Sequence, residues 1–347
     1  MKRSKMLFRG AVALLLVGTV GGWLISLDSQ VFANGQPGSG GSPGGTTYSG
    51  QATVVDADVL GLATVTLSDT GPLPSSGGAL EESLLEVEVP ELLSAEVLHA
   101  STVGQGDRTR SEASVATLNL TAGGHTISAG FLLARAEAIC TPRGETISGD
   151  SEIAELVVDG TPITVGAEPN QTIPLPNGEI VINEQTSNGP GDITVTALHV
   201  VLPGIADVAI SSAHADIACV GKPVCEGEDF VTGGGWITTP SGARANFAVA
   251  GGIKNGQFWG HLMYIDHETG MKVKGTEVTG YAELDPTTRF IEGMADINRS
   301  SGFTYEVEVT DNGEPGRNDV LTIRLSNGYE ASEFLDGGNI QLHTPCR

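Results

Sequence analysis

Basic residues are scarce in this chain of 347 residues, which has 18 Lys and Arg against 42 Asp and Glu. The formal net charge of −24 repels nucleic acids and anionic membranes, so we expect neither as a partner. Long hydrophobic runs are also rare. Residues 11–27 approach the roughly 20 apolar residues that span a bilayer, and no other stretch does. Composition therefore excludes a nucleic-acid-binding protein and a protein with several membrane-spanning helices.

The one apolar run has the pattern of an export signal. Four basic residues precede it, and Val31, Phe32 and Ala33 follow it as a small-x-small cleavage signature. We expect residues 1–33 to be a cleaved signal peptide, with retention as a membrane anchor as the alternative. The chain ends on Cys346 and Arg347 with no sorting motif. We therefore expect secretion, or non-covalent attachment at the cell surface, and no membrane contact after cleavage.

Cysteine is limited to four residues, and all four follow the export signal. Cys140 and Cys219 lie within one globular segment, whereas Cys225 and Cys346 bracket the next. Export permits disulfides, and this bracketing predicts one bond per domain, Cys140–Cys219 and Cys225–Cys346. The rival arrangement pairs Cys219 with Cys225 and would leave Cys140 to reach Cys346 across the domains.

The first globular segment is predicted to be an antiparallel β-sandwich. Residues 34–50 are rich in Gly, Ser and Pro and form a predicted linker. Residues 51–221 contain many short runs of Val, Ile, Leu and Thr, several of which alternate with period two. Glycine turns such as the one at residues 176–178 separate them, as in hairpins. Only residues 80–86 have a sequence that could form one or two helical turns.

Residues 226–347 form a second predicted domain with a different composition. They hold 12 of the 17 aromatic residues, whereas residues 51–225 contain only Phe131. Short glycine-containing links join successive strand-like runs, which indicates an antiparallel meander. The sequence therefore predicts a second, smaller antiparallel β-sandwich or barrel, and an all-β protein overall.

Several strings in both segments resemble known bacterial domains. GQATVVDADVLG, SDTGPLPSSGGALEESLL, GDRTRSEASVATLNL and SSAHADIACV are similar to the first domain of the choice-of-anchor P secreted proteins. FVTGGGWITTPSG, DNGEPGRNDVLTIRLSNGY and GGNIQLH resemble the post-COAP-1 domain that often follows it. The resemblance covers nearly all of the chain after the export signal. It implies an exported bacterial surface protein, and it brings no activity and no catalytic residues.

One stretch has the composition of a calcium loop. Oxygen-bearing side chains crowd residues 311–319, where glycine and proline interrupt the chain. Hard cations such as calcium bind oxygen ligands of this kind, although the spacing is not that of an EF-hand. The candidate ligands are Asp311, Asn312, Glu314 and Asp319. The alternative interpretation is a hairpin loop, because these residue types also favour turns. The only cofactor that the sequence suggests is therefore calcium.

The aromatic residues of the second domain suggest a ligand-binding surface. Trp236, Trp259, Tyr264 and Tyr281, together with Phe258, could form a sugar-binding platform or line a barrel cavity. Strand alternation places Phe258 and Trp259 on opposite faces, so one of the two should be exposed. The alternative is that these aromatics fill the core of a small β domain.

Motifs for catalysis are missing from the sequence. The seven histidines form no zinc-type spaced pair, although His199 and His214 lie in neighbouring predicted strands and could face each other near Asp216. The run Thr232 to Trp236 contains three glycines but no nucleophile elbow and no phosphate loop, so the glycines are expected to permit close approach of neighbouring groups. We predict no catalytic residues.

The sequence therefore predicts an exported, non-catalytic protein of the bacterial surface or medium, with a structural or adhesive role. Its partner is unidentified, and a cell-envelope or extracellular polymer is one candidate. The first alternative is a carbohydrate- or small-ligand-binding module that uses the aromatics of the second domain. The second alternative is a secreted hydrolase that uses carboxylates.

Overall fold

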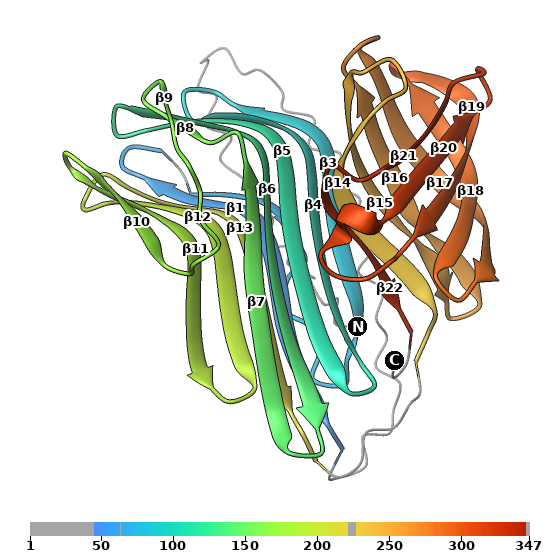
Figure 1. Cartoon of the computed structure of the whole chain (residues 1–347), viewed down its shortest axis with the longest axis horizontal. Helices are drawn as coiled ribbons and strands as arrows, with labels where there is room; N and C mark the ends of the chain where they lie inside the picture. Colours follow the sequence, from blue (N-terminus) through green and yellow to red (C-terminus); the bar gives the residue numbers. More distant parts are fainter. Residues whose placement is uncertain (1–44, 63, 221–226, 345–347) are drawn as a thin grey trace, which may run out of the picture.

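The computed structural model describes residues 45–62, 64–220 and 227–344 (Figure 1). These residues form three antiparallel sheets, which we name A, B and C, and one short 3-10 helix, η1 (Gly316–Asn318). The all-β prediction is confirmed. Within the described ranges no helix has the length and apolar character needed to cross a membrane.

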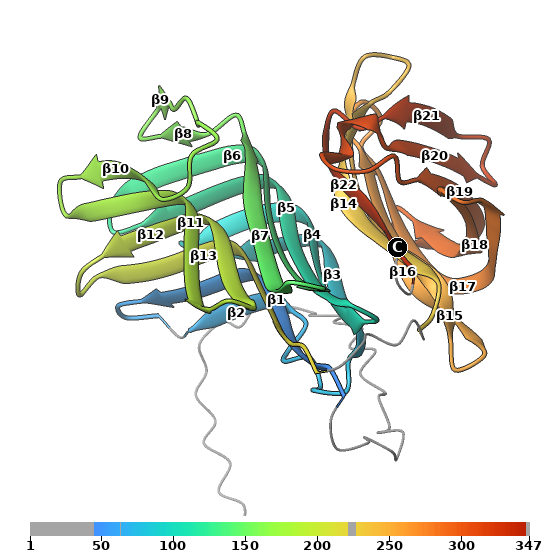
Figure 2. The same ribbon diagram turned by 60° about the horizontal axis from the view of Figure 1, so that its bottom comes forward.

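Sheets A and B pack face to face as a β-sandwich (Figure 2). Sheet A has the order β10-β11-β12-β13-β1-β2, and sheet B has the order β3-β4-β5-β6-β8-β9 with β7 also paired to β6. The strands of sheet A are β1 (Thr47–Val59), β2 (Val65–Asp69), β10 (Gln171–Leu175), β11 (Gly178–Gly189), β12 (Asp192–Leu202) and β13 (Ala206–Ala218). The strands of sheet B are β3 (Gly78–Val89), β4 (Leu93–Gln105), β5 (Arg108–Ala122), β6 (His125–Thr141), β7 (Gly144–Ala154), β8 (Val157–Val158) and β9 (Thr161–Pro162).

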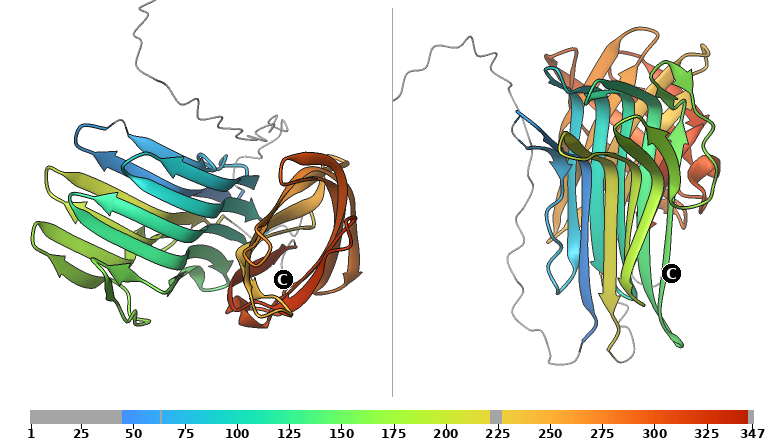
Figure 3. Two further views of the ribbon diagram at one scale, coloured as in Figure 1. Left: turned by 90° about the horizontal axis from the view of Figure 1, so that it is seen from above. Right: turned by 90° about the vertical axis from the view of Figure 1, so that its left-hand side faces the viewer.

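Sheet C is a single meander that curls into a half-barrel (Figure 3). Its order is β21-β20-β19-β18-β17-β16-β15-β14-β22, so successive strands pair until the last strand returns beside β14. Its own apolar core lies on the concave side and includes Phe247, Tyr264 and Tyr305. Its strands are β14 (Phe230–Thr238), β15 (Arg244–Lys254), β16 (Gln257–Asp266), β17 (Met271–Asp285), β18 (Thr288–Ile297), β19 (Ser300–Thr310), β20 (Val320–Leu325), β21 (Glu330–Phe334) and β22 (Gly337–His343).

Sheet C packs against the outer face of sheet B, which is therefore buried on both faces. A small apolar cluster joins the two sheets, and we call the contact the B–C interface. Its buried members are Val97, Ala116, Phe131, Leu133, Ala248, Met263 and Ile265. In β6, Leu132 points into the A–B core and its neighbour Leu133 into the B–C interface, and both are fully buried. The order of layers is thus A, B, C.

This two-sided burial explains why the helical prediction for residues 80–86 is wrong. The segment belongs to β3, which pairs with β4 from Gly78 to Val89. Leu84 packs against the A–B core and Leu85 against the B–C interface. A strand with apolar contacts on both faces loses the alternation of a half-exposed strand, so its pattern resembles that of a helix.

The predicted linker also ends earlier than Gly50. Strand β1 begins at Thr47, and Tyr48 donates a hydrogen bond from its hydroxyl to Gly106 O at 2.8 Å. The backbone of Tyr48 pairs with Ile217 of β13. Thr47 to Gly50 are therefore part of sheet A, because they pair with β13 and the partly buried ring of Tyr48 packs against the A–B core.

Cys140 and Cys219 form the predicted disulfide, with Cα atoms 5.7 Å apart. Cys140 lies near the end of β6 in sheet B, and Cys219 directly follows β13 in sheet A, so the bond ties together the two sheets of the sandwich. The rival pairing of Cys219 with Cys225 is excluded. Cys225 and Cys346 lie outside the described residues, and their pairing stays a prediction.

The three glycines of β14 permit close packing, as expected from the sequence. A Cβ atom on Gly233 would lie 2.6 Å from the backbone oxygen of Asn339 in β22. A Cβ atom on Gly235 would lie 2.4 Å from the backbone oxygen of Gly337. These distances are shorter than real Cβ contacts, so β14 and β22 can adopt this arrangement only because both positions lack a side chain.

We predict that Gly233→Ala destabilises the protein by about 1–3 kcal/mol, because the new methyl group meets backbone atoms that cannot rotate away. Gly189→Ala is the matched control, since a Cβ atom there would meet nothing within 4 Å. Urea unfolding of the protein without residues 1–33 measures the effect of both substitutions. Equal stability of the two variants would contradict the close-packing account.

Candidate functional site

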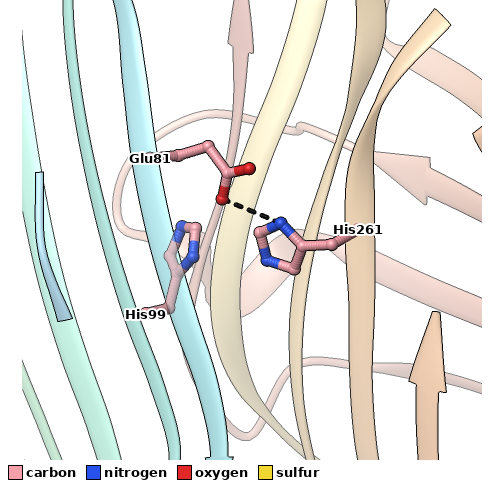
Figure 4. Close-up of side chains that lie close together, drawn as sticks. All are labelled: Glu81, His99 and His261. Atoms are coloured by element: carbon pink, nitrogen blue, oxygen red, sulfur yellow. Dashed lines mark ion pairs between the residues drawn. The ribbon is translucent and has the colours of Figure 1, made fainter. Parts of the chain in front are cut away.

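The most concentrated group of metal-type ligands in the described part of the chain lies at the B–C interface. Glu81 of β3, His99 of β4 and His261 of β16 point toward one another (Figure 4). One donor atom from each side chain lies within 4.8 Å of the donors of the other two. Sheet B supplies Glu81 and His99 and sheet C supplies His261, so the group exists only when the two sheets are packed together.

A hydrogen bond, an ion pair and burial orient the two imidazole rings. His99 is 0% exposed, and its Nδ1 lies 2.8 Å from the hydroxyl oxygen of Ser83. The Nδ1 atom of His261 lies 2.8 Å from Glu81 Oε2 in an ion pair whose side chains are only 9% and 5% exposed. The ring centroids are 5.8 Å apart. In each ring one nitrogen is held by a partner and the other remains for a further ligand.

The electrostatic environment keeps His99 neutral. Burial lowers the pKa of His99 to about 3, and the neighbouring charge of His261 acts in the same direction. A neutral imidazole can ligate a metal through its unprotonated nitrogen, whereas an imidazolium cannot. His99 is therefore in its ligand form over the whole physiological pH range.

Sequence reasoning missed this group because its members come from three strands and two sheets. His99 and Glu81 meet through the β3–β4 pairing, in which Glu81 is opposite Ser101 and Ser83 is opposite His99. His261 lies on the other side of the B–C interface, in sheet C. A period-two comparison of the two hairpin strands could have paired Ser83 with His99, but no local signal points to His261.

The predicted calcium ligands do come together in one loop, the hairpin connection between β19 and β20. All six carboxylate oxygens of Asp311, Glu314 and Asp319 face hydrogen-bond donors. Asn312 donates from its side-chain amide to Asn318 O at 2.6 Å. Burial raises the pKa of Asp319 to about 7. These contacts favour the hairpin-loop interpretation, and calcium binding here stays a prediction.

Two of these carboxylates close the outer edge of β22. This strand pairs with β14 on one side only, and an unpaired strand edge is a template for aggregation. Alternate backbone N–H groups along that edge each donate to a carboxylate instead of a strand. The pairs are Gly338 N to Glu152 Oε2 at 3.1 Å, Ile340 N to Asp319 Oδ2 at 2.9 Å and Leu342 N to Asp311 Oδ2 at 2.8 Å.

The four predicted ligand-binding aromatics have separate surroundings. Tyr264 is fully buried in the core of sheet C, and its hydroxyl lies 2.6 Å from the hydroxyl of Tyr329. Tyr281 donates its hydroxyl hydrogen to Asp229. Trp236 packs at the B–C interface with the guanidinium of Arg244 4.1 Å from its ring centroid.

Trp259 lies against Phe230, with ring centroids 5.4 Å apart. Its neighbour Phe258 is 47% exposed, as alternation requires for one of the two. Phe258 therefore presents an aromatic ring to solvent at the β15–β16 hairpin, beside its cross-strand partner Ile253, which is 40% exposed.

His199 and His214 do not face each other. His199 is opposite Ala209 and His214 is opposite Thr194 in the β12–β13 ladder. Each has its own carboxylate partners, which for His199 are Glu184 and Asp207, both at 2.8 Å, and for His214 is Asp192 at 3.1 Å. The hypothetical site with Asp216 is therefore not formed.

Comparisons with known proteins identify no family for this chain. No family model matches it, and no curated protein is significantly similar to it. Kievitone hydratase from Nectria haematococca shares 8% identity over 87% of this chain and 89% of its own, with a TM-score of 0.21. A putative AttH from Nitrosomonas europaea shares 9% identity over 86% and 93%, with a TM-score of 0.18. Neither likeness carries an argument about structure or activity.

A second buried acid at the B–C interface has an unusual ionisation. Glu112 is 4% exposed and accepts a hydrogen bond at 3.0 Å from the side-chain amide of Asn339 in β22. Burial raises the pKa of Glu112 to about 8, although the positive charge of Arg135 acts against this. In the folded protein Glu112 therefore binds its proton more tightly than in the unfolded chain.

Between about pH 4.5 and pH 8 the folded protein keeps this proton, whereas the unfolded chain has lost it. The contribution of Glu112 to the free energy of unfolding therefore falls as the pH rises through that range. Above pH 8 it changes no further. The side chain of the Glu112→Gln variant cannot ionise. We predict that the free energy of unfolding of this variant, relative to that of the parent, increases by at least about 1 kcal/mol when the pH is raised from 5 to 9. A tenfold change in an ionisation constant corresponds to about 1.4 kcal/mol. Urea unfolding at both pH values measures the difference. An unchanged difference between the two proteins would show that Glu112 ionises normally.

Proposed function

We propose that this protein is an exported, non-catalytic component of a bacterial surface or extracellular matrix, with a structural or adhesive role. The observation that carries the proposal is the attachment of sheet C to the sandwich. An apolar cluster, several ion pairs and several hydrogen bonds cross the B–C interface, so the three sheets form one layered body. A body in which three sheets are attached to one another in layers suits a structural module.

The ion pairs across the interface lie at several places around the apolar cluster. Positive and negative partners come from both sheets, so the attachment does not depend on one contact. The pairs are Arg135 with Glu314, Lys272 with Glu86, Arg317 with Glu152 at 2.7 Å, Arg244 with Glu155 at 3.3 Å and His267 with Glu96 at 3.3 Å. Exposed ion pairs contribute little singly, and their value here is in fixing the orientation of the two sheets around an apolar centre.

The location outside the cell rests on two further features. Disulfides persist in oxidising compartments, and the Cys140–Cys219 bond is compatible with one. The export pattern of residues 1–33 and the resemblance to choice-of-anchor P proteins support the same location. We include membership of that family in the proposal.

Binding to envelope polymers tests the adhesive role. The protein without its signal peptide is incubated with insoluble cell-wall sacculi and with polysaccharides, and both sedimentation and released products are measured. We expect co-sedimentation with at least one polymer and no released product. Product release that a single Asp or Glu substitution abolishes would contradict the proposal and establish the hydrolase alternative.

Ligand binding by the aromatics is a second candidate, favoured by the exposed Phe258 at the β15–β16 hairpin. If a glycan binds there, the fluorescence of neighbouring Trp259 changes on titration, and Phe258→Ala weakens binding at least tenfold. Phe334→Ala is the matched control, because Phe334 is 63% exposed on β21 of the same sheet. Equal effects of the two substitutions, or no fluorescence change, would remove this candidate.

A further inference from the structure

We infer that Glu81, His99 and His261 bind a divalent transition-metal ion, with zinc as the best match, and that this ion clamps sheet C to sheet B. Two imidazoles and one carboxylate are a ligand set that zinc uses in proteins. Hard cations such as calcium and magnesium prefer oxygen ligands alone, so they do not fit.

The strongest observation is a pair of buried ring nitrogens without partners. No described residue accepts from or donates to the Nε2 atom of His99 or the Nε2 atom of His261, and both atoms are inaccessible to solvent. A buried polar atom without a partner costs about 1–3 kcal/mol, so native proteins rarely leave two side by side. A metal ion ligated by both histidines would satisfy them together.

The remaining contacts of these rings match those of metal-binding histidines. A ligating histidine usually fixes its other nitrogen on a hydroxyl, carbonyl or carboxylate, and this fixes the ring orientation. Ser83 provides that contact for His99. Glu81 lies 2.8 Å from His261 Nδ1, and its carboxylate is within 4.8 Å of one donor atom of each histidine. To serve as the third ligand of an ion on the Nε2 atoms, Glu81 would exchange its contact with Nδ1 for the ion.

The spacing is close to what a metal requires. Zinc bonds of about 2.0–2.2 Å place tetrahedral ligand atoms about 3.4 Å apart. The donors here lie within 4.8 Å of one another, so small side-chain rotations of about 1 Å or less per group would bring them to the ion. Because the three side chains are nearly buried, a substrate has no access, and the site is structural rather than catalytic.

The position of the site gives the ion a defined effect. Sheet B and sheet C contribute ligands separately, so binding requires the packed B–C interface and stabilises it by mass action. Metal binding should therefore raise the melting temperature and protect the interface from proteolysis. The competing interpretation is a His261–Glu81 ion pair beside a neutral His99 with no affinity for metal.

The test uses the tag-free protein without its signal peptide, treated with chelator and then titrated with zinc chloride. We expect one zinc ion per chain by mass spectrometry and calorimetry, a melting temperature raised by several degrees, and visible absorption bands of tetrahedral cobalt when Co²⁺ replaces zinc. Failure of the parent protein to bind zinc or cobalt, or binding without a rise in melting temperature, would overturn the inference.

Three variants locate the site. His261→Asn and His99→Asn should each weaken zinc binding at least tenfold, and Glu81→Gln supplies the same test if a histidine variant does not fold. His267→Asn is the matched control, because His267 forms another interface pair, 3.3 Å from Glu96, but has no second histidine in that pair. It should bind zinc as the parent does. Equal binding by the parent, Glu81→Gln and His261→Asn would place the metal elsewhere and overturn the inference.

Discussion

The burial of sheet B on both faces is the constraint on which the rest of this structure depends. One face packs on sheet A to form a sandwich core, and the other packs on the curled sheet C. In β5, Val115 and Ala116 show the consequence, because these successive residues are both buried in different contacts. Burial of apolar surface contributes about 25 cal/mol per Å², so covering the second face stabilises the protein beyond the sandwich alone. The cost is that polar groups on that face must find partners within the interface.

Several of those polar groups have their partners across the two sheets rather than within one. Glu152 of β7 accepts both from Arg317 and from the edge of β22, and Glu112 of β5 accepts from Asn339. The raised pKa of Glu112 follows from the same burial. Glu81, His99 and His261 belong to this interface as well, and two of their ring nitrogens have no hydrogen-bond partner among the described residues. The interface therefore combines apolar packing, carboxylates that close a strand edge, and one group whose chemistry suits a metal.

Much of the fold could be predicted from local pattern, whereas the candidate site could not. Glycine turns and alternating runs indicated antiparallel strands, and the spacing of Cys140 and Cys219 indicated their bond. The prediction failed at residues 80–86, where contacts of Leu84 and Leu85 on opposite faces erase alternation. The candidate site could not be predicted for a related reason. His261 meets Glu81 and His99 only through packing between sheets, and no short-range spacing in the sequence indicates that contact. The aromatic prediction shows the same limit, since composition alone cannot separate buried Tyr264 from exposed Phe258.

The most direct test of this account is whether sheet C and the sandwich unfold together. Trp236 and Trp259 both lie in sheet C, so tryptophan fluorescence of the protein without residues 1–33 reports that sheet and its contact with sheet B. Hydrogen exchange of amides in β11 and β12 reports the far sheet of the sandwich. The account predicts that both signals change at the same urea concentration, because sheet B cannot lose one cover without exposing its apolar face. Loss of the fluorescence signal at a lower urea concentration, with β11 and β12 still protected, would contradict it.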